Sequence, residues 1–249
     1  VQMPLIDGDV VAEDGRALFE VEGTVYPEWI LNTMHLGREI TPETFRIPAI
    51  DSNGEPLAGP TALVRVIEAI PGRVSNIERH MAVPVANGQL LCDTGQDVLK
   101  AFVFERHHET GTFGYGFTSG YGIHGALAQT VAHDAHNLLV VGDNDEDMAI
   151  AANALVNCGG GAVAVQDGRV LGLVELPVAG LMSTKPLEEV ATEVAGLERA
   201  WADMGCTMPS PFMTMGLTSL ACLPDLRLTN RGLVDCNAFK FVPLVVDEE

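Results

Sequence analysis

The segment 133–148 of this chain reads HDAHNLLVVGDNDEDM. Its apolar run, residues 138–142, is too short for anything but a buried strand. The polar residues immediately before that run are His133, Asp134, His136 and Asn137. Polar groups fixed at the start of a core strand cost stability unless each finds a partner, so the segment predicts a site.

Downstream, the pattern predicts a helix, a hairpin and a second helix. Asp143 is placed to cap a helix that runs to about residue 157, with Glu146 completing a capping box and Gly159–Gly161 ending the helix. Residues 162–166 and 169–175 predict a hairpin. Apolar residues then recur every three or four positions from Leu187 to Met204, which predicts an amphipathic helix started by Pro186.

Upstream, residues 99–105 predict a strand that delivers Arg106 and His107 at its end, and residues 126–133 predict a short helix. Residues 1–75 predict short β segments, including a hairpin at Asp14-Gly15 and a strand over 62–67. The expected fold class is therefore α+β or mixed α/β. A small β-rich portion, 1–75, precedes a mixed α/β domain, 76–249.

Composition excludes several classes of protein. Apolar residues make up 47% and charged residues 19% of 249, so the chain can bury a substantial core and is not disordered. No apolar run reaches the ~18 residues of a membrane span, and no secretory signal is expected before the fold. The 5 cysteines are odd in number and form no Cys-x-x-Cys motif. These features predict reduced thiols in a cytoplasmic protein.

The net charge of −20 argues against nucleic-acid binding, which requires a basic surface. Two interpretations of the acidic balance remain open. One is adaptation to high salt, where screening relieves repulsion between carboxylates. The other is an ordinary solvated acidic surface.

Several segments in order resemble one family. Residues 125–148 are similar to a motif in the C-terminal domain of adenine deaminases of the amidohydrolase superfamily. Further similar segments are 32–35, 105–107, 110–111, 159–161, 176–183, 211–214, 224–229 and 232–235. Ala128-Gln129-Thr130, Ala135 and Ala221-Cys222 depart from the family pattern, which affects fine substrate contacts.

The resemblance implies hydrolysis of adenine to hypoxanthine and ammonia, as in adenine catabolism and purine salvage. It assigns a divalent metal, manganese or iron, to a catalytic barrel that carries a His-x-His pair. That pair is absent here. The chain is therefore expected to be the C-terminal part of a longer, homo-oligomeric enzyme and to be inactive alone. Residues 1–75 would complete the β domain that flanks the barrel. The alternatives are a non-catalytic purine-binding or assembly module, and an amidohydrolase with another substrate.

Within that interpretation His133, Asp134 and His136 are the candidate catalytic residues, beside the purine or around a water that relays protons. The alternative is structural: Asp134 bonds local backbone while the two imidazoles satisfy each other. The candidate substrate-binding residues are His107, Asn137 and Ser183. No metal site is expected in this chain, because two histidines and one carboxylate lack a further ligand. Gly159–Gly161 lacks the strand-to-helix order of a phosphate loop.

Overall fold

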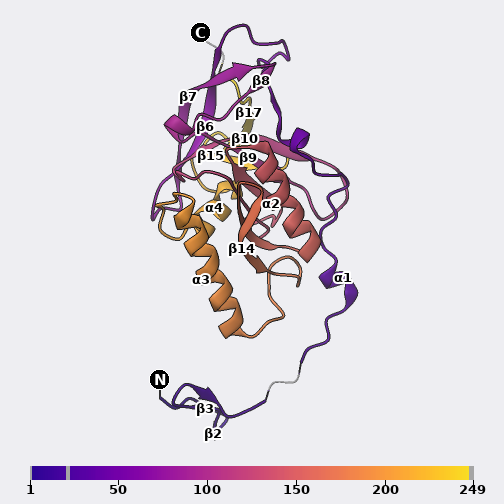
Figure 1. Cartoon of the computed structure of the whole chain (residues 1–249), viewed down its shortest axis with the longest axis vertical. Coiled ribbons are helices and arrows are strands. Elements are labelled where there is room, and N and C mark those ends of the chain that lie inside the picture. Colours follow the sequence, from indigo (N-terminus) through magenta and orange to yellow (C-terminus); the bar gives the residue numbers. More distant parts are fainter. Residues whose placement is uncertain (1, 21–22, 247–249) are drawn as a thin grey trace.

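Most strands of the chain join one large mixed sheet (Figure 1). The computed structural model describes residues 2–20 and 23–246. The strands are β1 (Leu5–Ile6), β2 (Asp9–Val10), β3 (Ala12–Glu13), β4 (Arg16–Ala17), β5 (Ile47–Pro48), β6 (Thr61–Ala69), β7 (Asn76–Ala86), β8 (Gln89–Leu90), β9 (Leu99–Phe104), β10 (Phe113–Ser119), β11 (Ala126–Gln129), β12 (Leu138–Gly142), β13 (Gly161–Gln166), β14 (Arg169–Glu175), β15 (Leu226–Thr229), β16 (Gly232–Asp235) and β17 (Lys240–Val242). The α-helices are α1 (Glu28–Leu31), α2 (Asp145–Cys158), α3 (Leu187–Asp203) and α4 (Pro211–Gly216). Short 3-10 helices span Pro42–Phe45, Thr94–Gln96 and Leu217–Ser219.

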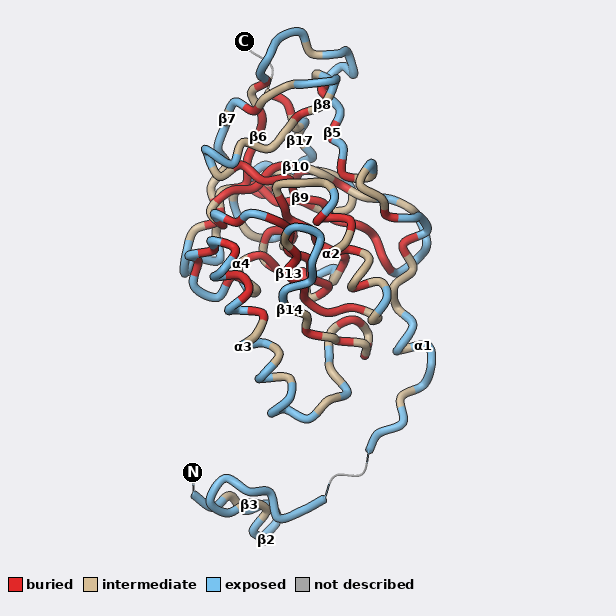
Figure 2. Tube along the Cα trace, viewed as in Figure 1, coloured by how far each residue is buried: buried red, intermediate tan, exposed pale blue. Residues whose placement is uncertain are grey.

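The 10-stranded sheet has the order β14-β13-β11-β12-β9-β10-β6-β7-β8-β5. Strands β10 and β6 pair in parallel, with Phe117 opposite Val66, and the other neighbours pair antiparallel. All residues of β9, β11 and β12 are buried, because these strands lie in the middle of the sheet and are covered on both faces (Figure 2). The predicted buried strand over 138–142 is confirmed.

Alternation along the central strands divides the core into two layers. Phe102 and Val140 belong to a cluster that includes α2, whereas Val103 and Val141 belong to one that includes α3 and α4. Successive side chains of a strand point to opposite faces, so α2 covers one face of the sheet and α3 with α4 covers the other. The fold is mixed α/β, as the sequence predicts.

A second sheet, β15-β16-β17, packs against β10 and brings the β15–β16 turn to the central sheet. Gly114 of β10 makes this approach possible. A Cβ at Gly114 would lie 2.0 Å from the carbonyl oxygen of Thr229 and 2.7 Å from the nitrogen of Gly232. Those distances are far inside van der Waals contact, so only glycine allows the turn to lie this close.

The N-terminal segment forms two small sheets, β1–β2 and β3–β4, that lie apart from the large sheet and are mostly exposed (Figures 1 and 2). Strands β3 and β4 pair around Asp14-Gly15, so the predicted hairpin is confirmed. Strands β5 and β6 instead extend the large sheet, which therefore crosses the predicted boundary between residues 75 and 76. The division into 1–75 and 76–249 stays a prediction, and residues 1, 21–22 and 247–249 of those ranges lie outside the described residues.

Two local expectations are wrong. Residues 126–129 form strand β11, between β12 and β13, instead of the start of a helix. Pairing with a strand on each edge overrides the local helical pattern. The N-cap of α2 is Asn144, whose side chain accepts from the Asp147 N–H at 2.8 Å, and not Asp143.

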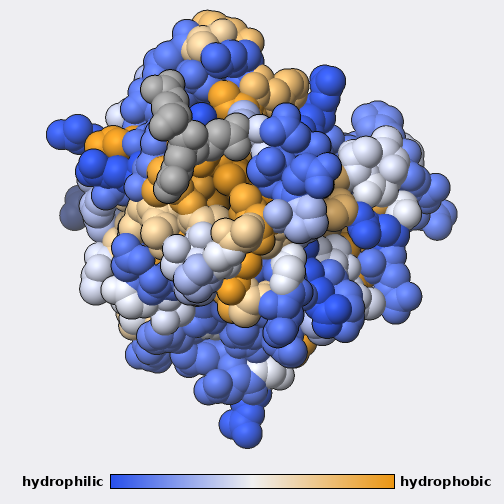
Figure 3. All heavy atoms as spheres, turned by 90° about the horizontal axis from the view of Figure 1, so that it is seen from above, coloured by the Kyte–Doolittle hydropathy of each residue, from blue (hydrophilic) through white to orange (hydrophobic). Residues whose placement is uncertain are grey.

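The surface of the molecule seen from above is largely hydrophilic, with a band of hydrophobic atoms across its middle (Figure 3). This agrees with the net charge of −20. None of the helices within residues 2–20 and 23–246 combines the length and hydropathy that a membrane span requires.

Candidate functional site

The segment 130–137 connects β11 to β12 and carries most of the predicted site residues. His136 adopts a left-handed conformation with φ of 50°, and its N–H donates to the carbonyl of Ala132 at 2.8 Å. The carbonyl of His133 accepts from Ser219 Oγ at 3.0 Å, and the His133 N–H donates to Gly216. The segment is therefore bonded both to itself and to residues some 80 positions later in the chain. We call residues 133–137 the His-Asp loop.

Arg106 holds the His-Asp loop in place through hydrogen bonds. Its Nε donates to the carbonyl of His136 at 2.5 Å, one terminal nitrogen to Thr33 at 2.9 Å, and the other to Ala179 at 2.9 Å. Arg106 is 1% exposed, and burial lowers its pKa to about 10. It remains protonated at neutral pH, and its charge is met by main-chain and hydroxyl oxygens.

The adjacent Glu105 orders the turn after β9. It accepts from the His107 N–H at 2.6 Å, from Thr110 Oγ1 at 3.0 Å and from His108. Burial alone would raise the pKa of this carboxyl, but these hydrogen bonds outweigh burial and lower the pKa to about 2. This turn also positions the His107 ring. Its Nε2 lies 2.8 Å from the carbonyl oxygen of Ala135. Because a carbonyl only accepts, Nε2 carries the proton.

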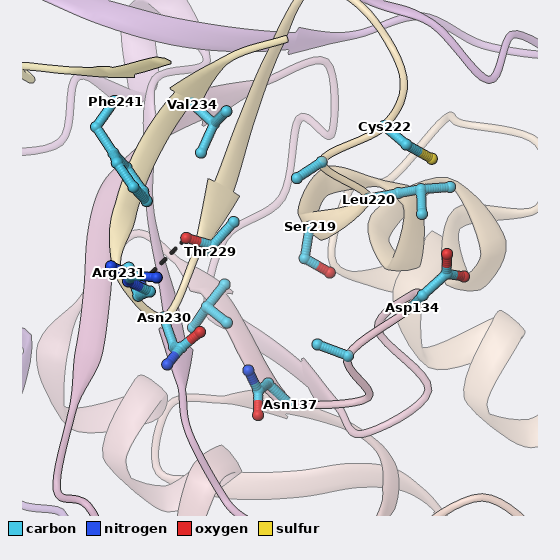
Figure 4. A pocket seen from close by; sticks show the side chains of 13 residues that line it. Asp134, Asn137, Ser219, Leu220, Cys222, Thr229, Asn230, Arg231, Val234 and Phe241 are labelled. Carbon is cyan, nitrogen blue, oxygen red and sulfur yellow. Dashed lines mark hydrogen bonds between the residues drawn. The ribbon is translucent and has the colours of Figure 1, made fainter. Parts of the chain in front are cut away.

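A cavity of about 480 Å³ opens beside the His-Asp loop. Asp134 lies on the same side of it as residues 219–222, residues 229–231 lie on the other side, and Asn137 lies between them (Figure 4). Its apolar wall includes Val103 of β9 and Val234 of β16. At one end, the Arg231 guanidinium lies over the Phe241 ring, 5.4 Å from the ring centre. We call this cavity the loop pocket.

The predicted site residues fall into two groups. Asp134 and Asn137 line the loop pocket, whereas His133, His136, His107 and Ser183 do not. The His133 and His136 rings meet edge to face at 5.7 Å. Ser183 Oγ accepts from the Lys185 N–H at 3.1 Å in a separate turn. The roles assigned to all six residues stay predictions.

The two pocket residues from the His-Asp loop have unpaired side chains. Within the described residues, the Asp134 carboxylate makes no hydrogen bond or ion pair, so it does not bond local backbone. Asn137 is 4% exposed, and its buried Oδ1 has no hydrogen-bond partner in the described part of the chain. Buried polar groups are nearly always paired, so the unpaired Asn137 amide marks a position that suits a ligand.

The rest of the lining contributes residues that the sequence analysis did not single out, chiefly Asn230, Arg231 and Cys222. The turn 229–232 is recognisable in the sequence, but only the fold places it across from Asn137. The five cysteines are free thiols, and Cys222 is exposed at the rim of the loop pocket.

The described residues do not fit a divalent metal. They contain no group of three or more His, Cys, Asp and Glu side chains that could hold one. His136 Nδ1 faces the carbonyl of Val131 at 3.3 Å, whereas Asp134 faces the loop pocket. The three predicted catalytic side chains therefore do not converge as ligands.

Comparison with known proteins shows one consistent similarity. Residues 74–240 match the family model described as "Adenine deaminase C-terminal domain". The chain is 59% identical over 245 residues to an adenine deaminase of Clostridium botulinum (strain ATCC 19397 / Type A), covering 98% of this chain and 40% of that protein. It is 49% identical over 242 residues to an adenine deaminase of Moorella thermoacetica, covering 97% of this chain and 40% of that protein. It is 39% identical over 244 residues to an adenine deaminase of Dehalococcoides mccartyi (strain CBDB1), covering 98% of this chain and 41% of that protein. The chain thus spans about 40% of the length of these curated relatives.

Proposed function

The chain belongs to the adenine deaminase family, and from that premise we propose that it works as part of an enzyme that hydrolyses adenine to hypoxanthine and ammonia. The match of residues 74–240 to the C-terminal domain of that family carries the proposal. The relatives that are named adenine deaminase are more than twice as long as this chain. The proposed activity therefore belongs to the whole enzyme, in which this chain is one part.

The reaction replaces the exocyclic amine of adenine with oxygen from water. Water must be activated to attack C6, and the departing nitrogen must be protonated. A divalent metal, manganese or iron, would supply the activated water. Because the described residues contain no cluster suited to such a metal, we assign its ligands to another part of the enzyme.

In this arrangement, the loop pocket would contribute to the wall of the substrate site. Asp134 offers an unpaired carboxylate that can accept or return a proton, and Asn137 offers an unpaired amide that can bond a purine. His133 and His136 remain proposed proton-transfer residues of the same loop. His107 remains a proposed substrate-binding residue, and its contact with the carbonyl of Ala135 places it beside the same loop. Ser183 remains a proposed contact with less geometric support, since its hydroxyl is engaged with Lys185.

We further propose that the enzyme is cytoplasmic and assembles as a homo-oligomer. The five free cysteines agree with a reducing compartment. The acidic surface agrees with a protein that does not bind nucleic acid.

A chimeric enzyme tests the proposed function. In the Clostridium botulinum adenine deaminase, this chain would replace the matching region, to which it is 59% identical. Release of ammonia from adenine by the metal-loaded chimera is the expected result. The 249-residue chain alone, with manganese or iron added, serves as the control and should release none. A folded, metal-loaded chimera without activity would contradict the proposed function.

A further inference from the structure

The Asn137 side chain is a buried amide without a partner. It is 4% exposed, its Oδ1 is buried and unbonded, and its amide nitrogen makes no hydrogen bond within the described residues. Such an amide can donate two hydrogen bonds and accept two. Removing it from water without replacing those bonds costs free energy. The amide nitrogen, which makes no hydrogen bond in the described part of the chain, is therefore left to donate to a molecule in the loop pocket.

The surrounding contacts hold the main chain at Asn137 in place. On one side the carbonyl of His136 accepts from Arg106, and the carbonyl of Ala135 accepts from His107. On the other side Leu138 begins β12 and pairs with Phe104 of β9. The main chain is thus fixed immediately before and after Asn137. Its amide can rotate but cannot leave the loop pocket.

Asn230, on the turn between β15 and β16, supplies a group that complements the Asn137 amide. Asn230 Nδ2 donates to Thr112 Oγ1 at 3.4 Å, which turns the Asn230 amide oxygen away from that contact. Figure 4 shows the nitrogen of Asn137 and the oxygen of Asn230 on the cavity side of their amides. The apolar side chains of Val103 and Val234 line the space beside them. The loop pocket thus offers a donor and an acceptor next to apolar wall, in a volume of about 480 Å³ that suits a small flat ligand.

We propose that the loop pocket is a purine subsite of this chain, selective for adenine over hypoxanthine and independent of metal. Asn137 Nδ2 donates to a ring nitrogen of the base, and Asn230 Oδ1 accepts from its exocyclic amine. Adenine carries this acceptor–donor pair along one edge, at N7 and N6. Hypoxanthine carries an oxygen in place of the amine, so two acceptors would face each other at Asn230. The pocket would therefore release the product that deamination forms.

The inference rests on the proposed function for the identity of the base, whereas the cavity and its unpaired amide stand on the structure. Calorimetric titration of the 249-residue chain with adenine and with hypoxanthine, both in excess EDTA, tests it. The expected result is one adenine bound per chain, at least about tenfold more tightly than hypoxanthine. In hypoxanthine, the hydrogen bond from the exocyclic amine to Asn230 Oδ1 is replaced by repulsion between two oxygens.

Four variants assign the binding to named groups. Asn137→Leu should weaken adenine binding by about tenfold or more. Asn230→Asp keeps the acceptor and should keep the preference for adenine, whereas Asn230→Leu should abolish the preference. Asn153→Leu on α2 is the matched control, since its amide donates to the carbonyl of Ile40 at 2.9 Å and lies outside the loop pocket. It should leave adenine binding unchanged, and thermal unfolding of each variant reports its folding.

Different outcomes separate this inference from the proposed function. Absence of adenine binding by the folded wild-type chain overturns the subsite, and so does equal weakening by the Asn137 and Asn153 variants. If the chimera turns over adenine while the isolated chain binds none, the proposed function stands and the subsite fails. If the isolated chain binds adenine with the expected variant pattern and the folded, metal-loaded chimera is inactive, the subsite stands and the proposed function fails.

Discussion

Arg106 Nε donates to the main-chain carbonyl of His136 at 2.5 Å, so a buried cation at the end of β9 sets the position of the His-Asp loop. The same guanidinium reaches Thr33 and Ala179. Three segments that are distant in the sequence therefore depend on one side chain. Its bonds end on three carbonyl oxygens and the Thr33 hydroxyl, which would lose their donor if the guanidinium were removed.

Arg106→Met should destabilise the chain by about 3 kcal/mol or more, since it leaves three part-buried carbonyls without their donor. For a domain of this size, that corresponds to a fall of roughly 6 °C or more in the midpoint of thermal unfolding, followed by circular dichroism. Arg38→Met is the control, because Arg38 is exposed and donates to the carbonyl of Gly111 at 3.2 Å. Equal midpoints for the two variants would show that Arg106 does not hold the loop.

Asp134→Asn and His136→Asn, made in the chimera, should each lower kcat/KM for adenine by roughly 10²-fold or more, the usual scale of general acid–base participation. Asparagine is chosen at position 136 because it tolerates the left-handed conformation, with φ of 50°, that His136 adopts. Metal content and the unfolding midpoint should stay near wild type. Parallel loss of activity and stability would make these residues structural, and full activity would place them away from the reacting atoms.

Glu105 should make stability depend on pH in the acid range. Its pKa is lowered from 4.5 to about 2 in the folded chain, so the folded state favours the charged carboxylate. The stabilisation by the Glu105 carboxylate is complete above pH 4.5, the pKa of this group in the unfolded chain. It is lost as the pH falls from 4.5 toward 2. Glu105→Gln should therefore be less stable than wild type at pH 7, by on the order of 3 kcal/mol.

Urea unfolding at pH 7, 4 and 3 measures this effect, and the gap between wild type and Glu105→Gln should narrow as the pH falls. Glu39→Gln, at an exposed position, provides the comparison. A gap at Glu105 that is constant with pH would mean that the carboxylate charge does not stabilise the turn.

The acidic surface allows a test between the two explanations of its charge. If it reflects adaptation to salt, the midpoint of thermal unfolding should rise between low salt and molar potassium chloride. The screening length falls from about 10 Å at 0.1 M to about 3 Å at 1 M, which removes repulsion between carboxylates. Sorbitol at the same osmolality as the potassium chloride is the control. It is excluded from the protein surface but does not screen charges, so a rise caused by screening should not occur in sorbitol. A midpoint that is flat or falls with potassium chloride favours an ordinary acidic surface.

Local patterns in the sequence predict the elements that local forces determine. Helices α2 and α3 and the β13–β14 hairpin follow from periodicity, turn residues and a terminal glycine, and all are present. Strand β11 does not follow, because its conformation is set by pairing with β12 and β13. The same limit applies to the site. The His-Asp loop is visible as a run of polar residues, but Asn230 reaches it only because Gly114 admits the β15–β16 turn.

The place of β6 in the large sheet determines how this chain can be divided. The family match begins at residue 74, whereas β6 spans Thr61–Ala69 and lies between β10 and β7. A protein that begins at residue 74 would lack β6. The edges of β10 and β7 that pair with β6 would then have no hydrogen-bond partner, and the apolar side chains of β6 would be missing from the core. Bare edges of this kind pair with other chains and promote aggregation or strand exchange. A folding unit that keeps the large sheet intact therefore begins upstream of residue 61, and not where similarity to the family model begins.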